Sequence, residues 1–415
     1  FDLAAASYEG RCLSRPVFLD QAEQAQLAHD LDRLHAALAS LPDRLFGGDI
    51  EQFARAVGLT GSQVGAVGRA GTATPTRLGR ADLYHDGTGF RLMELNLGSN
   101  IGGLDTALLN GAFLAHPKLA RFVEEAKLTY VDTLAEVVDT LRTECRLPAD
   151  RRPLVAAVDW PDSFASLEPQ LRHSAAALYP LGIEAVPCHI GQVEVTRGRV
   201  WLDRRPVDAV YRIFMLEDLA DPAAAALAEP LLGAVERGEV AMFTPMHAEL
   251  FGSKAALAML SDEAHRHLHD PQTLASLDRI LPWTRRVRPG EVTVDGHRVD
   301  LFDHAREHQA ELVLKPASLH GGSGVVLGWQ VDAGRWRGVL RSALDGAFVL
   351  QRRVRAVPEL FPATDGRQPW LLRWGVFTVS RGYGGATVIG TTATDGGVVN
   401  MSTGAIAGCC FHQSA

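Results

Sequence analysis

Acidic, amide and guanidinium side chains recur at alternate positions in two neighbouring stretches of the chain. Arg80 and Asp82 lie in the first stretch, Glu94 and Asn96 lie in the second, and the turn-forming sequence at 86–89 (Asp-Gly-Thr-Gly) separates them. Residues i and i+2 of a strand share one face, so a hairpin would bring these side chains together. Hard oxygen ligands suit Mg²⁺, and an arginine beside them suits a phosphate that the metal would bridge. On spacing alone, a solvated hairpin face with ordinary ion pairs is the alternative.

A lysine and a glycine-rich loop follow a later apolar strand. The stretch 311–316 delivers Lys315, and Gly321, Gly322 and Gly324 come next. Glycines let backbone N–H groups approach phosphate oxygens, and the lysine adds a positive charge. The loop is not a Walker motif, because G-x-x-x-x-G-K-[ST] is absent and a strand is expected after it. A glycine hairpin without a ligand is the alternative.

A third candidate is the stretch 348–354, which begins as an apolar strand and ends in charged residues. Such a strand can present backbone groups to the edge of an adenine ring. Taken alone, it is equally consistent with an ordinary edge strand.

The elements that must position these groups follow from hydrophobic periodicity. Apolar residues at helical spacing predict helices over 20–41, 50–57 and 333–344, and one long helix from Pro117 to about 141. Strands at 154–160, 184–188 and 208–214 alternate with helices, which predicts a parallel sheet with an antiparallel hairpin at one edge. Further strands are expected at 325–331, 371–380 and 384–394. The predicted fold class is thus α/β and α+β.

Three units are expected from these patterns: 1–149, with N-terminal helices and the charged hairpin; 150–245, an α/β domain; and 246–415, an α+β nucleotide-binding domain. The length of 415 residues fits two or three domains at about 100–200 residues each.

Composition excludes several classes of protein. Lys plus Arg number 41 against 49 Asp plus Glu, a net charge of −8, which disfavours a dedicated nucleic-acid binder. No apolar run approaches the length needed to cross a bilayer, so we expect a soluble protein without a membrane partner. Five cysteines, scattered and without a C-x-x-C pair, favour a reducing cytoplasm over a disulfide framework.

Together these motifs resemble the ATP-grasp ligases, in the circularly permuted branch that includes eukaryotic glutathione synthetase and glutathionylspermidine synthetase. The resemblance extends from Arg80 to about Ala405 and rests on motifs in the right order. It implies a circularly permuted ATP-grasp fold with an inserted parallel-sheet substrate domain, and ATP and Mg²⁺ as cofactors. Metal binding is implied for Asp82, Glu94 and Asn96, and a catalytic role for Arg80, Lys254 and Lys315.

The resemblance also implies two binding sets. Nucleotide contacts are expected from Lys254, Lys315, His320, Gly321, Gly322, Ser323, Gly324, Gln351, Arg352, Arg353 and Val354. Substrate contacts are expected from Ser99, Asn100, Gly102, Gly103 and Arg212, the last of which would clasp a carboxylate.

The sequence departs from the family at three places. His320 stands where the glutathione synthetases have a metal-binding glutamate, Arg352 replaces the usual glutamate of the adenine-binding strand, and the segment 387–397 lacks the arginine and lysine that grip the acceptor. Nucleotide and metal roles therefore transfer better than the identity of the acceptor.

The implied function is an ATP-dependent carboxylate–amine ligase that joins amino acids or small peptides by an amide bond, peptide or γ-glutamyl in type, through an acyl phosphate. Two alternatives remain: a phosphotransferase on the same scaffold, and a non-catalytic nucleotide-binding partner protein. Donor, acceptor and pathway stay open, and a homodimer is compatible with the sequence.

Overall fold

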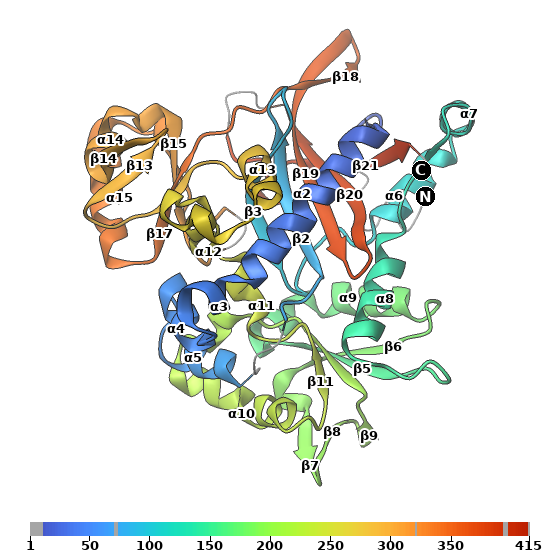
Figure 1. Ribbon diagram of the computed structural model, residues 1–415. Coiled ribbons are helices and arrows are strands. Elements are labelled where there is room, and N and C mark those ends of the chain that lie inside the picture. Colours follow the sequence, from blue (N-terminus) through green and yellow to red (C-terminus); the bar gives the residue numbers. More distant parts are fainter. Residues whose placement is uncertain (1–10, 70–73, 320–321, 393–396, 414–415) are drawn as a thin grey trace.

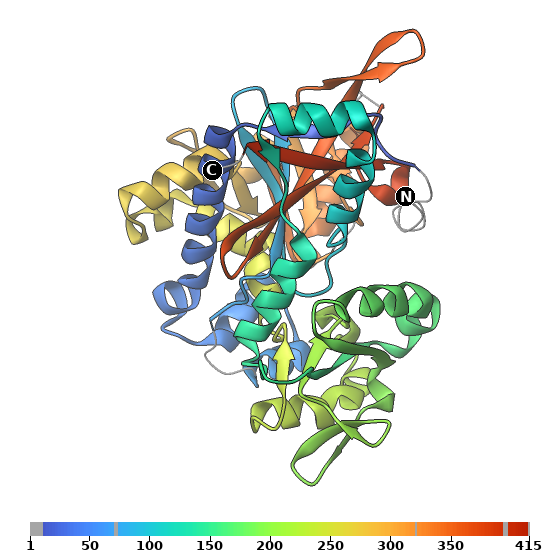
Figure 2. The same ribbon diagram turned by 90° about the vertical axis from the view of Figure 1, so that its right-hand side faces the viewer.

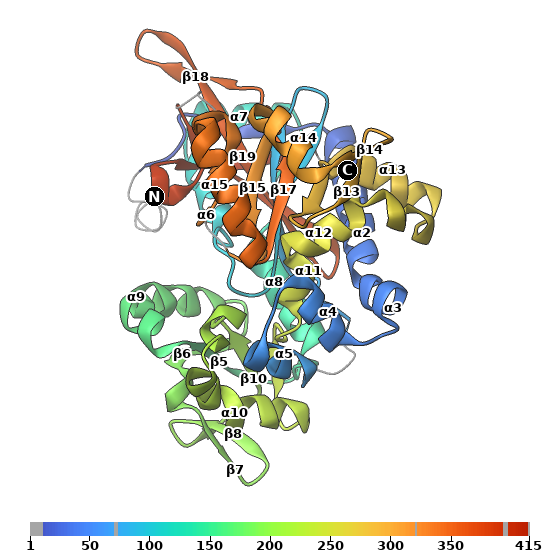
Figure 3. The same cartoon turned by 90° about the vertical axis from the view of Figure 1, so that its left-hand side faces the viewer.

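The computed structural model describes residues 11–69, 74–319, 322–392 and 397–413. A central sheet, a parallel-sheet lobe and a smaller antiparallel lobe make up the molecule (Figure 1). The parallel-sheet lobe, green in Figure 2, lies below the central sheet in that view. Figure 3 shows the antiparallel lobe from its own side.

The central sheet combines both ends of the chain. Eight strands form it within the described residues, in the order β1-β21-β20-β19-β2-β3, with β18 beside β19 and β4 beside β21. Only the β1–β21 pair is parallel. The strands are β1 (Val17–Leu19), β2 (Gly79–His85), β3 (Phe90–Leu97), β4 (Leu128–Thr129), β18 (Glu359–Ala363), β19 (Gly366–Val379), β20 (Gly382–Thr391) and β21 (Ile406–Gln413).

The predicted charged hairpin is confirmed as β2 and β3. Asp86 starts the turn, because its Oδ1 accepts hydrogen bonds from the backbone N–H groups of Thr88 (2.9 Å) and Gly89 (3.1 Å). The register places Arg80 opposite Asn96 and Asp82 opposite Glu94. Ala81 and Leu83, on the other face of β2, are fully buried in the core. The period of two therefore separates an apolar face from a polar one.

The predicted parallel strands are present as a four-stranded sheet in the order β11-β10-β5-β6, in which every pair is parallel. The predicted edge hairpin is wrong in one respect: β7, β8 and β9 form a separate three-stranded sheet. The chain leaves β6 through a short 3-10 helix, η1 (Ile190–Gln192), which takes the hairpin off the sheet edge. The strands are β5 (Leu154–Asp159), β6 (Glu184–His189), β7 (Glu194–Thr196), β8 (Arg199–Leu202), β9 (Arg205–Pro206), β10 (Ala209–Arg212) and β11 (Ala241–Phe243), with helices α9 (Pro161–Leu178) and α10 (Pro222–Glu236).

The antiparallel lobe holds the strand that carries Lys315. Its sheet has the order β12-β17-β15-β16, and its core includes the buried Trp336 and Leu340. The strand predicted at 325–331 is shorter than expected, since Gly328–Gln330 turns into a 3-10 helix where the Gly328 carbonyl accepts from Gln309. The elements are β12 (Thr284–Arg286), β13 (Glu291–Val294), β14 (His297–Asp300), β15 (Leu312–Pro316), β16 (Val326–Leu327), β17 (Phe348–Arg352), α14 (Leu301–Glu307) and α15 (Ala333–Ser342).

The helix predicted at 20–41 is α2 (Gln21–Ala39), which begins with a capping box between Asp20 and Glu23. The single helix predicted from Pro117 is wrong. Lys127 adopts a left-handed backbone (φ 52°), β4 follows it, and Asp132 caps a new helix through the Ala135 N–H. The remaining helices are α3 (Leu41–Phe46), α4 (Ile50–Val57), α5 (Gly61–Gly68), α6 (Thr106–Leu114), α7 (Pro117–Glu125), α8 (Thr133–Glu144), α11 (Ala248–Gly252), α12 (Lys254–Ser261) and α13 (Pro271–Ile280). None of the helices in the described ranges is long and apolar enough to span a membrane.

Candidate active site

Arg80 and Asp82 form a forked ion pair on the polar face of β2. Arg80 Nε and Nη2 donate to the two Asp82 oxygens at 2.7 and 3.1 Å. Asp82 is fully buried, and it also accepts from Asn96 Nδ2 (3.3 Å) and lies 3.5 Å from Arg373 Nη1. Gly375 on β19 makes room for this arrangement, because a Cβ there would lie 2.9 Å from Arg80 Cδ. The buried carboxylate thus fixes two guanidinium groups.

Glu94 pairs with a lysine from another part of the chain. Lys254 Nζ lies 3.1 Å from Glu94 Oε2 and donates to the Leu319 carbonyl at 3.0 Å. Burial alone would raise the pKa of Glu94, but Lys254 and Lys315 outweigh burial and hold that pKa well below its usual value. Glu94 is therefore ionised at neutral pH.

Lys315 lies behind this pair. Its ammonium donates to the Met93 carbonyl (3.0 Å) and to Gln351 Oε1 (2.6 Å). Burial and the like charge of Lys254 lower the pKa of Lys315 to about 8, although Glu94 pulls it upward. Gln351 is in turn held by Thr284, since its Nε2 donates to Thr284 Oγ1 at 3.2 Å.

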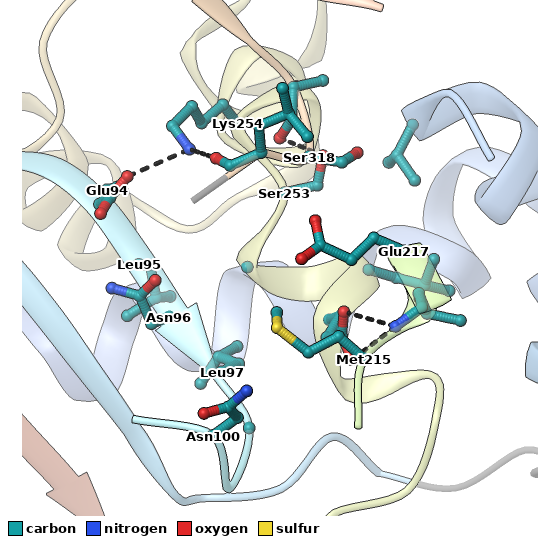
Figure 4. Close-up of a pocket in the computed structure, with 18 of the residues that line it drawn as sticks. Glu94, Leu95, Asn96, Leu97, Asn100, Met215, Glu217, Ser253, Lys254 and Ser318 are labelled. Atoms are coloured by element: carbon teal, nitrogen blue, oxygen red, sulfur yellow. Dashed lines mark hydrogen bonds and ion pairs between the residues drawn. The ribbon is translucent and has the colours of Figure 1, made fainter. Parts of the chain in front are cut away.

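Arg80, Glu94, Lys254 and Arg373 line one cavity of about 500 Å³, whereas Asp82, Lys315 and Gln351 lie behind its wall (Figure 4). Glu94 and Lys254 form their ion pair on one side of it, and Asn96 and Asn100 lie further along the same wall. Of the residues expected to contact substrate, metal or phosphate, the cavity wall contains Arg80, Glu94, Asn96, Asn100, Gly102, Arg212 and Lys254. The structure thus brings together groups from distant parts of the sequence.

Ser99 and Arg212 join the hairpin to the parallel sheet. Ser99 Oγ donates to the Arg212 carbonyl and accepts from the Thr244 N–H at 3.0 Å. The Arg212 guanidinium is 2% exposed and makes four hydrogen bonds within the protein, among them an ion pair with Glu249 at 2.5 Å. A two-pronged clasp of a substrate carboxylate would therefore have to displace Glu249. The carboxylate-binding role of Arg212 stays a prediction, and so does substrate contact by Ser99 and Gly103. A Cβ added at Gly103 would lie 3.3 Å from Thr387.

Two members of the glycine loop, His320 and Gly321, lie outside the described residues. Gly322 and Gly324 have left-handed backbones (φ 81° and 69°). A Cβ on Gly324 would lie 2.7 Å from Pro316, so the loop needs glycine there. The Cβ position of Gly322 lies 3.9 Å from Asn400, a residue of the cavity wall, whereas Ser323 is exposed.

The predicted adenine-binding strand divides into two parts. Gln351 faces Lys315, as described above. Arg352 pairs with Asp295 at 2.8 Å, and Arg353 stacks on the Trp329 ring at 3.7 Å. Neither arginine belongs to the cavity wall, and Val354 lies beyond the end of β17. Nucleotide contact by these three residues stays a prediction.

The donor atoms on the cavity wall fit Mg²⁺. Glu94 offers carboxylate oxygens, and Asn96 uses its N–H on Asp82, which leaves its carbonyl oxygen for a ligand. Mg²⁺ is commonly held by one or two carboxylates together with substrate phosphates. The described residues contain no cluster of three or more His, Cys, Asp or Glu that could hold a metal ion on its own. Both Asp82 oxygens accept hydrogen bonds from Arg80, so Asp82 orients that arginine. Metal binding by Asp82 would require it to release Arg80 and stays a prediction.

The wall residues that were not predicted from the sequence include Arg373, Glu217, Glu249 and Asn400. Arg373 had a visible signal, because it is the one charged residue in the apolar stretch 371–379. Glu217 and Glu249 stand among other acidic and apolar residues, and no pattern distinguishes them.

Neither protein-family models nor curated proteins gave a match to this chain. Among solved structures, a glutathione synthetase-like effector from Globodera pallida is similar over 96% of this chain and 89% of its own, with a TM-score of 0.58 and 12% identity. This chain has a glutathione synthetase-like fold. At this identity the likeness concerns the fold alone, and it confirms the resemblance inferred from the motifs at that level.

Two weaker likenesses accompany it. A putative γ-glutamylcysteine synthetase from Methylobacillus flagellatus matches 90% of this chain and 86% of its own with a TM-score of 0.46 and 14% identity. A D-cycloserine synthetase matches 54% of this chain and 71% of its own, with a TM-score of 0.29 and 18% identity. These two likenesses carry no argument, and circular permutation and domain insertion stay predictions.

Proposed function

We propose that this protein is an ATP- and Mg²⁺-dependent ligase that joins a carboxylate to an amine. The observation that carries the proposal is the Lys254–Glu94–Lys315 cluster beside the Arg80–Asp82 fork, of which Lys254, Glu94 and Arg80 line one end of the cavity. Such a collection of buried charge is costly for folding alone, because desolvation is only partly repaid by pairing. A multiply charged ligand explains these buried charges better than a role in folding does.

The reaction in question brings like charges together. A carboxylate oxygen attacks the terminal phosphorus of ATP, ADP leaves, and an amine then displaces phosphate from the acyl phosphate to give the amide. The ammonium groups of Lys254 and Lys315 would hold the phosphates, and Arg80 and Arg373 would face the transferring group. A Mg²⁺ ion held by Glu94 and Asn96 would supply further neutralisation of phosphate charge.

Asp82 and Gln351 have supporting roles in this proposal. Asp82 fixes the orientation of Arg80, and Gln351 holds Lys315 by a 2.6 Å hydrogen bond. Preorganised charges of this kind need no rearrangement during the reaction, which is the main source of their effect on the rate. Glycines at 322 and 324 would let the loop close over the phosphates and keep water from the acyl phosphate.

Product analysis tests the proposal. A panel of amino-acid and peptide donors with amine acceptors is incubated with ATP and Mg²⁺, and ADP is measured together with the mass of each product. We expect ADP in proportion to an amide product that requires both substrates. ADP with a phosphorylated acid and no amide would show a phosphotransferase instead.

A further inference from the structure

The charges on the cavity wall are divided between its two ends. Arg80, Lys254 and Arg373 gather around Glu94 at the end proposed for phosphates. At the other end the ionisable wall residues are Arg212, Glu217 and Glu249. The first end therefore carries a positive excess, and the second a negative one.

The negative excess is due to Glu217, because Arg212 and Glu249 neutralise each other. Arg212 Nη1 donates to Glu249 Oε1 at 2.5 Å, and Glu249 also accepts from the Leu216 N–H at 3.2 Å. The Glu217 side chain makes no hydrogen bond or ion pair within the described part of the chain, and its carboxylate points into the cavity in Figure 4. Glu217 is an exposed residue, so its carboxylate at this end is accessible to a ligand.

The turn that presents Glu217 is held rigidly. It is the 3-10 helix η2 (Leu216–Leu219), and side chains from α5 fasten its backbone. Gln63 Nε2 donates to the Leu216 carbonyl at 2.8 Å, and Ser62 Oγ donates to the Leu219 carbonyl at 2.6 Å. Asp218 accepts from the Met215 N–H at 2.7 Å. The neighbouring polar side chains therefore hold the turn, while the Glu217 side chain faces the cavity.

The electrostatic potential at this turn is negative. Burial raises the pKa of Asp218, and the carboxylates of Glu217, Asp159 and Glu249 raise it further. A second carboxylate group on a substrate would be repelled here, whereas a cation would be attracted.

We propose that the end of the cavity beside Met215 binds an ammonium group of the substrate, with the Glu217 carboxylate as its counter-charge. This inference rests on the proposed ligase function and narrows its substrates to those with a protonated amine away from the reacting carboxylate. The amine can belong to the α-amino group of an amino-acid donor or to a di- or polyamine acceptor. Both share the same charge-assisted contact, and the experiment separates them.

Calorimetry with the full-length protein tests binding without turnover. The probes are L-glutamate with its deaminated analogue glutarate, and 1,4-diaminobutane with 1-butanol. We expect at least one amine probe to bind the wild type more tightly than its amine-free analogue. Because Glu217 is exposed, Glu217→Gln should weaken that binding by roughly twofold to fivefold, as expected for loss of an ion pair accessible to solvent. If Glu217→Gln weakens binding of L-glutamate, the ammonium group belongs to an amino-acid donor. If it weakens binding of 1,4-diaminobutane, the ammonium group belongs to an amine acceptor.

A matched control is Glu194→Gln, which removes an exposed carboxylate from β7. It should leave binding of every probe unchanged. Tighter binding of glutarate than of L-glutamate, unchanged amine binding in Glu217→Gln, or no binding of either amine at millimolar concentration would overturn the inference.

Steady-state kinetics separate this inference from the proposed function. For any pair of donor and acceptor that supports ADP release, Glu217→Gln should raise KM for the amine-bearing substrate. It should leave KM for ATP within about twofold. If no pair supports ADP release, the ligase proposal fails, while calorimetry still decides whether Glu217 binds an ammonium group.

Discussion

The Glu94 carboxylate on β3 and the Lys254 ammonium at the start of α12 lie 3.1 Å apart. Lys254 also ties α12 to the segment after β15, through its Nζ contact with the Leu319 carbonyl and its N–H contact with the Ala317 carbonyl at 2.9 Å. The Lys254 ammonium therefore links the central sheet to the antiparallel lobe, as the Lys315 ammonium does through the Met93 carbonyl. A ligand that attracts the Lys254 ammonium would act on both parts of the molecule.

Glu94→Gln should remove the negative charge that lies between the two buried ammonium groups of Lys254 and Lys315. It also removes one proposed metal ligand. We expect a loss of turnover of about two to three orders of magnitude. Circular dichroism should verify the fold, since breaking a buried ion pair commonly costs about 3–5 kcal/mol. Turnover like that of the wild type at millimolar Mg²⁺ would disprove the role of Glu94.

Binding of ATP should depend on pH through Lys315. Its pKa is lowered to about 8, so the ammonium is charged below pH 8 and loses its proton above it. Phosphate is attracted by the charged form, and the affinity should therefore fall as the pH rises through this range. Because Glu94 raises this pKa, the Glu94→Gln variant should lose affinity at a lower pH. Calorimetric titration from about pH 6.5 to about pH 9.5, a range that spans this pKa, measures both effects, and a flat profile would contradict them.

Lys254→Met and Lys315→Met should each weaken ATP binding roughly tenfold to a hundredfold, because each removes a charged phosphate contact. Donor binding should change little. Lys118→Met, at an exposed position of α7, is the matched control. Unchanged ATP affinity in both variants would mean that the nucleotide phosphates lie elsewhere.

Gly375→Ala should disturb Arg80 without removing any charge. The new Cβ would lie 2.9 Å from Arg80 Cδ and 3.0 Å from Thr387 Cγ2, so the arginine must shift away from Asp82. We expect kcat to fall at least about tenfold, since misplacing a catalytic group by about 1 Å can cost roughly 100-fold. Gly338→Ala in α15, where a Cβ meets nothing within 4 Å, should retain full activity. Equal activity of the two variants would argue against a role for Arg80.

The ion pair of Arg212 and Glu249 should be important for stability. Glu249→Gln leaves a buried guanidinium without its carboxylate, and we expect a loss of about 3–5 kcal/mol in the free energy of unfolding. Urea denaturation measures this loss. Arg212→Lys tests the predicted carboxylate clasp as well, by raising KM for the donor but not for ATP. An unchanged stability of Glu249→Gln would show that the pair contributes nothing.

The local part of the site could be predicted from the sequence. The alternation of Arg80 with Asp82 and of Glu94 with Asn96 fixes which face each side chain takes, and the turn at Asp86 fixes their register. Both signals act over a few residues, so the sequence contains them directly. The break in the helical pattern after Pro117 is harder to predict, because it depends on the left-handed backbone of Lys127, and the one local signal is the capping residue Asp132.

The pairing of distant groups could not be predicted. Nothing in the sequence indicates that Glu249 occupies Arg212, or that Arg373 approaches Asp82, because these contacts depend on how the sheets pack. Glu217 is similar: its importance comes from the direction of its carboxylate and from the neutralised pair beside it, which only the folded chain defines.

The most direct test of the central claim follows oxygen from donor to phosphate. A donor labelled with ¹⁸O in its reacting carboxylate is incubated with ATP, Mg²⁺ and the amine acceptor, and the released phosphate is measured by mass spectrometry. A ligase that forms an acyl phosphate transfers one ¹⁸O to phosphate for each amide and each ADP. Unlabelled phosphate, or AMP in place of ADP, would contradict this account.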